Sequence, residues 1–186
     1  MAAAPVGFDT RRFRRVFGHF CTGVTVITTA DAAGPAGFAC QSFTPLSLDP
    51  PLVLFCPQQT SATWQRIRSA GVFCVNILAD EHRDVSRTFG TSGPDKFAGL
   101  AWRPAPSGAP ILPDALTWAD CQITEIHPGG DHDIVVGRVT SLGECRDAGP
   151  LLFYRGRYTG TAPVSPHEVP EVVDTLLAWP RHTDWI

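Results

Sequence analysis

Residues 37–51, GFACQSFTPLSLDPP, are the stretch of sequence that decides the fold. They begin with small residues, which allow a backbone to approach a flat group closely, and they end in a rigid double-proline corner. An apolar strand is predicted at residues 52–56, and a Ser/Thr-rich helix start, TSATW, follows at residues 60–64. A helix start can hold a phosphate, because its first backbone N–H groups have no partner within the helix. This order favours a nucleotide held mainly by main chain rather than by charged side chains.

The length and composition are typical of one globular domain. The chain has 186 residues, of which 44% are hydrophobic and 18% are charged. No apolar run approaches the ~20 residues of a membrane span, and the N-terminus lacks a signal-peptide pattern. We therefore expect a cytoplasmic protein with no membrane partner. The net charge of −3 gives no electrostatic support to a nucleic-acid partner, and we interpret the arginines at positions 11, 12, 14 and 15 as the solvated face of a helix.

The six cysteines are scattered singly, with no C-x-x-C pair and no zinc-finger spacing: Cys21, Cys40, Cys56, Cys74, Cys121 and Cys145. We expect buried thiols in a reducing compartment and no metal site.

The hydrophobic pattern predicts a mainly β chain with a few helices. Apolar residues at 13, 16, 17 and 20 form one helical stripe, which Asp9 or Thr10 can cap. Strands are expected at 24–29, 37–43, 52–56, 72–78, 116–126, 134–142 and 151–154. Further helices are expected at 61–70 and 80–89, and a long loop at 90–113. This set predicts an antiparallel, Greek-key-like barrel decorated with helices, and a parallel doubly wound sheet fits worse because strands and helices do not alternate regularly.

Two later segments bear on function. GGDH at residues 129–132 separates two predicted strands, so it is either a plain hairpin turn or a turn that presents His132 to a ligand. YRGRY at residues 154–158 suits adenine stacking and pyrophosphate binding, or is a strand end with arginines lying along the surface. The chain has no G-x-G-x-x-G and no P-loop motif, so a nucleotide must be held in another way.

Together the three segments, 37–64, 129–132 and 154–158, resemble the short-chain flavin reductases, the reductase components of two-component flavin-dependent monooxygenases. The resemblance runs from about residue 13 to residue 160 in unbroken order. Within the family the chain looks most similar to the reductase components of actinobacterial steroid-ring hydroxylases. The resemblance implies a flavin-binding split β-barrel at residues 1–160, followed by a tail at 161–186 whose short helix, near 169–179, packs on the domain. It also implies a homodimer with flavin near the subunit boundary, where the Phe-rich first helix could contribute.

The resemblance assigns cofactor-binding residues along these motifs: Ala39, Cys40, Gln41, Ser42, Ser47, Cys56, Ser61, Thr63, Lys96 and Phe97. The backbone at 39–42 would bond the edge of the flavin ring. Ser61 and Thr63 would hold the flavin phosphate, or would only cap the helix. Lys96, the only lysine, would face the phosphate, or would be a solvated surface charge.

His132 is the predicted catalytic residue, beside the flavin ring and the incoming nicotinamide. Tyr154 and Arg155 join it as predicted NADH-binding residues. Asp131 is expected to point away from His132 by strand alternation, which makes the two a poor dyad.

The resemblance implies an NAD(P)H-dependent flavin reductase. NADH or NADPH would pass a hydride to FMN or FAD, and the reduced flavin would go to a separate oxygenase, in aromatic or steroid degradation. One alternative is an enzyme like pyridoxamine-phosphate oxidase, which uses several basic residues around FMN. The other is a non-catalytic flavin-binding or flavin-sensing module.

Overall fold

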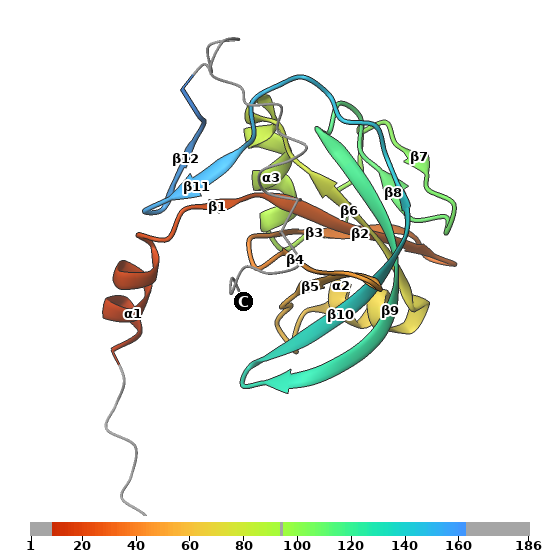
Figure 1. Ribbon diagram of the computed structural model, residues 1–186, viewed down its shortest axis with the longest axis horizontal. Helices are drawn as coiled ribbons and strands as arrows, with labels where there is room; N and C mark the ends of the chain where they lie inside the picture. Colours follow the sequence, from red (N-terminus) through yellow and green to blue (C-terminus); the bar gives the residue numbers. More distant parts are fainter. Residues whose placement is uncertain (1–8, 94, 163–186) are drawn as a thin grey trace, which may run out of the picture.

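A seven-stranded antiparallel sheet dominates the computed structural model, which describes residues 9–93 and 95–162 (Figure 1). Its strands are β2 (Thr25–Asp31), β3 (Gly34–Cys40), β4 (Thr44–Leu48), β5 (Pro51–Phe55), β6 (Val72–Ile77), β9 (Thr117–Gly129) and β10 (His132–Leu142). Their order in the sheet is β3-β2-β6-β9-β10-β5-β4, and every neighbouring pair is antiparallel. The predicted mainly β, antiparallel class is therefore confirmed, whereas closure of the sheet into a barrel stays a prediction.

Two smaller sheets flank the large one. One consists of β1 (Thr22–Gly23), β11 (Leu152–Tyr154) and β12 (Arg157–Thr159), and the other pairs β7 (Arg103–Pro104) with β8 (Pro110–Ile111). The helices are α1 (Thr10–Phe17), α2 (Ala62–Ala70), the short 3-10 turn η1 (Asp80–His82) and α3 (Arg83–Gly90). No helix in the described ranges combines the length and the apolar character that a membrane span requires.

Local chemistry explains where these elements begin and end. Asp9 caps α1 by accepting hydrogen bonds from the backbone N–H groups of Arg11 and Arg12. Gly71 ends α2 in the left-handed conformation, with φ of 70°, which costs a glycine little. Gly130, with φ of 80°, turns β9 back into β10, so the hairpin predicted at 129–132 is confirmed.

The main core lies between the sheet and α2. Phe55 and Phe73 meet in a T-shaped arrangement with ring centroids 5.0 Å apart, and Trp64 of α2 packs against Phe55 at 6.0 Å. Each of these fully buried side chains contributes roughly 1.5–3 kcal/mol by leaving water. A second cluster, around Phe89 of α3 and the buried Phe97, holds the loop that follows α3. The two clusters fix the helices and loops that surround the site.

Several predicted boundaries and environments were wrong. The strand predicted at 37–43 begins earlier and ends at Cys40, because residues 41–43 turn the chain into β4. The predicted loop at 90–113 contains the short strands β7 and β8. Cys40, Cys74 and Cys121 are buried as expected, whereas Cys21 and Cys145 are exposed because they lie in segments outside the sheet core. The predicted tail helix, near 169–179, lies outside the described residues.

Candidate functional site

A pocket of about 1120 Å³ brings together six separate segments of the chain. These are α1 through Phe13, the end of β3, the loop after β5, the start of α2, the end of α3 with the loop after it, and the turn between β9 and β10. Nine of the predicted site residues line it: Ala39, Cys40, Gln41, Ser42, Cys56, Ser61, Thr63, Lys96 and His132. The motif at 37–51, the helix start and the later histidine therefore form one site.

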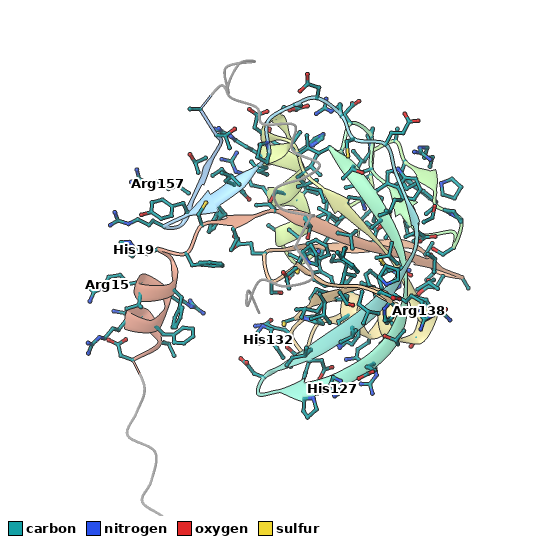
Figure 2. All side chains as sticks on the ribbon, viewed as in Figure 1. Arg15, His19, His127, His132, Arg138 and Arg157 are labelled. Carbon is teal, nitrogen blue, oxygen red and sulfur yellow. The ribbon has the colours of Figure 1, made fainter. Side chains whose placement is uncertain are left out.

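Four predicted residues do not line this pocket. Ser47 is half-buried in β4, and Phe97 is buried against Phe89, with ring centroids 5.0 Å apart. Tyr154 and Arg155 lie in the β11–β12 hairpin beside α1, where the Arg155 N–H donates to the Gly18 carbonyl at 2.9 Å. Figure 2 shows Arg15, His19 and Arg157 on the same side as α1, apart from His132 at the end of the β9–β10 hairpin. The flavin and NADH roles assigned to these four residues stay predictions.

The sequence reasoning missed other residues that line the pocket: Phe13, Phe38, Pro57, Gln58, Thr60, Ala62, Phe89, Gly129 and residues 90–93. Residues 90–93, GTSG, begin at the last residue of α3 and are predicted from the sequence only as part of a long loop. Their small and hydroxyl-bearing side chains are the one sequence feature that could have indicated a binding loop. Phe13 is predicted only as part of a helical stripe, and no local pattern relates it to a pocket formed by other segments.

The start of α2 provides hydrogen-bond donors at one end of the pocket. Ser61 is the N-cap, and its Oγ accepts from the Trp64 backbone N–H at 3.2 Å, so the capping role is confirmed. The same hydroxyl keeps its own proton for donation. Thr63 lies in the first turn, where backbone N–H groups have no partner within the helix. This end of the pocket is chemically suited to an anion.

Lys96 supplies a cationic group to the same pocket. Its Nζ donates to the Phe89 carbonyl at 3.0 Å and to the Gly37 carbonyl at 3.3 Å. The side chain is half-buried, and this burial lowers the pKa of its ammonium group. Lys96 is therefore held in place rather than being a freely solvated surface charge, and the two carbonyls use two of its three N–H bonds.

Ser42 ties the end of β3 to the end of β5. Its Oγ accepts from the Cys56 backbone N–H at 2.9 Å, donates to the Cys56 carbonyl at 3.2 Å, and lies 3.3 Å from the Cys40 sulfur. Burial raises the pKa of both thiols, which keeps them neutral. The wall of the pocket between these strands is therefore uncharged and fixed by backbone contacts.

His132 begins β10, is half-buried and lines the pocket, where it pairs with Gln58 in an isolated antiparallel bridge. Its Nδ1 lies 2.7 Å from the Asp131 carboxylate, and this contact lowers the pKa of Asp131. The expectation that Asp131 points away was wrong, because Asp131 lies in the turn before β10, where strand alternation does not apply. Asp131 and His132 form a hydrogen-bonded pair at the edge of the pocket.

The chain is similar to proteins of one family over most of its length. The family model described as the flavin reductase like domain matches residues 17–162. The reductase subunit HsaB of a flavin-dependent monooxygenase from Rhodococcus jostii is 56% identical over 162 residues, which cover 87% of this chain and 83% of that protein.

Two solved structures are also similar to this chain. Nitrilotriacetate monooxygenase component B from Mycobacterium thermoresistibile superposes with a TM-score of 0.83 at 51% identity, covering 91% of this chain and 97% of that one. The Streptomyces globisporus NADH:FAD oxidoreductase SgcE6, in complex with NAD and FAD fragments, superposes with a TM-score of 0.81 at 35% identity, covering 87% and 98% of the two chains. The chain belongs to the flavin reductase like domain family.

Proposed function

We propose that this protein is an NAD(P)H-dependent flavin reductase that reduces FMN or FAD and supplies the reduced flavin to a separate monooxygenase. The observation that carries the proposal is the single pocket in which the end of β3, the start of α2 and His132 meet. The relatives support it, because one is named as the reductase subunit of a flavin-dependent monooxygenase and another as an NADH:FAD oxidoreductase. The resemblance to steroid-ring hydroxylase reductases supports a role in aromatic or steroid degradation.

The residues of the pocket fit a flavin. The helix start, the hydroxyls of Ser61 and Thr63 and the ammonium group of Lys96 offer donors to a phosphate. The neutral wall at residues 39–42 and Cys56 suits an uncharged ring system. Lys96 is the one lysine or arginine among the described lining residues, which disfavours a site like that of pyridoxamine-phosphate oxidase, with several basic residues.

When bound, the flavin would supply the electron-accepting chemistry, and the chain would bind and orient it. The backbone at 39–42 would hold the ring edge, and the α2 start with Lys96 would hold the phosphate. His132 would lie beside the ring and the nicotinamide, with its orientation set by Asp131. Alignment of the two reactants is the main contribution required of such a site.

The finer features of the proposal concern assembly and location. We propose that the antiparallel sheet is a flavin-binding split barrel at residues 1–160, with a tail at 161–186 packing on it, in a cytoplasmic protein. We also propose a homodimer formed through α1. No residue of α1 is buried, and its apolar Phe17, together with the nearby Phe20, is 60% and 75% exposed. In Figure 1, α1 lies apart from the large sheet, and the exposed Phe17 and Phe20 offer apolar surface to a second copy of the chain.

The test mixes purified protein with NADH or NADPH and with FMN, FAD or riboflavin in turn, and follows nicotinamide absorbance. We expect catalytic oxidation that depends on added flavin, with reduced flavin released. Tight flavin binding without turnover would instead support the flavin-sensing module. Activity that a chelator abolishes would contradict the proposal entirely.

A further inference from the structure

The carboxylate of Asp133 lies behind the pocket with both oxygens engaged. Its Oδ2 accepts from the indole N–H of Trp64 at 2.8 Å, and its Oδ1 accepts from the side-chain amide of Gln59 at 2.9 Å. Asp133 is 7% exposed and Trp64 is fully buried. A carboxylate at such a place is costly unless it is hydrogen-bonded, and the two donors meet that need.

Further hydrogen bonds join residues 57–59 to residues 131–133. The Asp133 N–H donates to the Pro57 carbonyl at 3.0 Å, and the Gln59 N–H donates to the Asp131 carbonyl at 3.1 Å. The Gln59 side-chain amide also donates to the His132 carbonyl at 3.3 Å. Residues 57–59 therefore run antiparallel along residues 131–133, with Gln58 opposite His132, and Asp133 joins this contact to α2 through Trp64.

The two residues that donate to Asp133, Gln59 and Trp64, lie next to or within the start of α2. Gln59 directly precedes Thr60 and Ser61, which line the pocket, and Trp64 lies in the first turn of α2. Asp133 directly follows His132, which also lines the pocket. Asp133 and Trp64 themselves do not line the pocket.

We propose that Asp133 is a positioning residue that fixes the start of α2 relative to His132, so that these two parts of the pocket lining keep one geometry. The inference rests on the proposed flavin reductase function. It predicts that loss of the carboxylate affects flavin affinity and reduction rate together. Loss of Ser61 would affect mainly affinity, and loss of His132 mainly rate.

The test compares Asp133→Asn with wild type for the FMN dissociation constant, and for the stopped-flow rate of flavin reduction by NADH at saturating FMN. Asparagine keeps the size of the side chain but can satisfy the two donors only if the Gln59 amide turns over, which removes the bond to the His132 carbonyl. We expect each quantity to worsen about tenfold, near the low end of what a hydrogen bond to a charged group contributes.

The matched control is Asp31→Asn. Asp31 also anchors α2 through its carboxylate, by way of Arg66 at 2.6 Å, but neither residue lines the pocket. We expect this variant to leave the FMN dissociation constant and the reduction rate within about twofold of wild type, since an exposed ion pair contributes little.

Wild-type affinity and rate in folded Asp133→Asn protein, with only a lower melting temperature, would overturn the proposal. If this variant does not fold, Trp64→Phe removes one N–H donor while keeping a buried ring, and wild-type behaviour in both measurements would overturn the proposal equally. Failure of the wild-type protein itself to reduce flavin would contradict the proposed function, so the two failures can be told apart.

Discussion

His132 and Asp131 are consecutive in the chain, yet their side chains meet, with 2.7 Å between Nδ1 and the carboxylate oxygen. The contact is possible because Asp131 belongs to the turn and His132 to the strand. It leaves Nε2 of the imidazole as the ring nitrogen available to other groups, and it sets the orientation of the ring.

The first prediction concerns this pair. His132→Ala should slow flavin reduction by NADH by roughly tenfold to a hundredfold, because orientation is lost while the electron acceptor remains. Flavin affinity should stay close to that of wild type. Asp131→Asn should slow the reaction less, and adding it to His132→Ala should cause no further loss, as stopped-flow measurements on the four proteins would show. An equal effect of Asp131→Asn in both backgrounds would mean that the carboxylate acts independently of the ring, and a wild-type rate in His132→Ala would remove the role assigned to His132.

The second prediction concerns the start of α2. Replacing Ser61 and Thr63 together by alanine should weaken FMN binding much more than riboflavin binding, because riboflavin has no phosphate. The loss for FMN should be on the order of 3 kcal/mol, as expected for two hydrogen bonds to a charged group. Calorimetric titration with both ligands measures the difference. Equal weakening of the two ligands would show that these residues only cap the helix.

The third prediction concerns packing beneath the sheet. A side chain at Gly137 would place its Cβ 2.7 Å from Cε1 of Phe73, a ring that is fully buried. Gly137→Ala should therefore lower the free energy of unfolding by about 1–3 kcal/mol, measured by urea denaturation. Gly23→Ala is the control, because nothing lies within 4 Å of the position that its added methyl group would occupy. Similar stability of the two variants would mean that β10 shifts to accept the extra carbon.

The fourth prediction tests assembly through α1. Phe17→Arg combined with Phe20→Arg should convert the proposed dimer to monomers, because charged groups would replace apolar surface at the interface. Sedimentation velocity would follow the change. The control is Leu142→Arg, at the end of β10. This side chain is likewise exposed, at 70%, and its replacement should leave the assembly unchanged. A dimer that survives the double change at α1 must use another surface.

The fifth prediction concerns acid. Hydrogen bonds from Trp64 and Gln59 lower the pKa of Asp133 below its ordinary value of 3.8. The unfolded chain therefore binds a proton at a higher pH than the folded chain does, and the stabilisation by Asp133 is present above pH 3.8 and is lost as the pH falls through the folded pKa. The difference in unfolding free energy between wild type and Asp133→Asn should shrink over that interval. A difference that stays constant from pH 7 to pH 3 would show that the pKa of Asp133 is not depressed.

The sequence predicted the parts of the fold that local chemistry determines. Alternating β-branched residues indicated β2, the glycines at 129 and 130 indicated the β9–β10 turn, and Ser61 indicated the start of α2. No local sequence pattern predicts which segments that are far apart in the chain contact each other. The bond from Trp64 to Asp133 joins residues 69 positions apart, and β1 pairs with β11 through Thr22 and Phe153.

For the candidate site too, the sequence predicted the local segments but not every contact between them. Residues 39–42, the α2 start and His132 converge on one pocket, because each lies at the end of a strand or helix that the sheet brings together. Residue type and the family resemblance group Tyr154 and Arg155 with them, whereas the pairing of β11 with β1 places these two residues beside α1. Residue type indicates which ligand a segment suits, but the strand order determines which segments meet.

The half-buried position of Lys96 also allows the pocket to be probed by chemical modification. Lys96 is the only lysine of the chain, so an amine-selective reagent has one side chain to modify besides the chain's N-terminal amine. The lowered pKa of its ammonium group enlarges the neutral, nucleophilic fraction at a given pH. A single mass increment on this residue would therefore report whether the pocket is open or filled, without any engineered label.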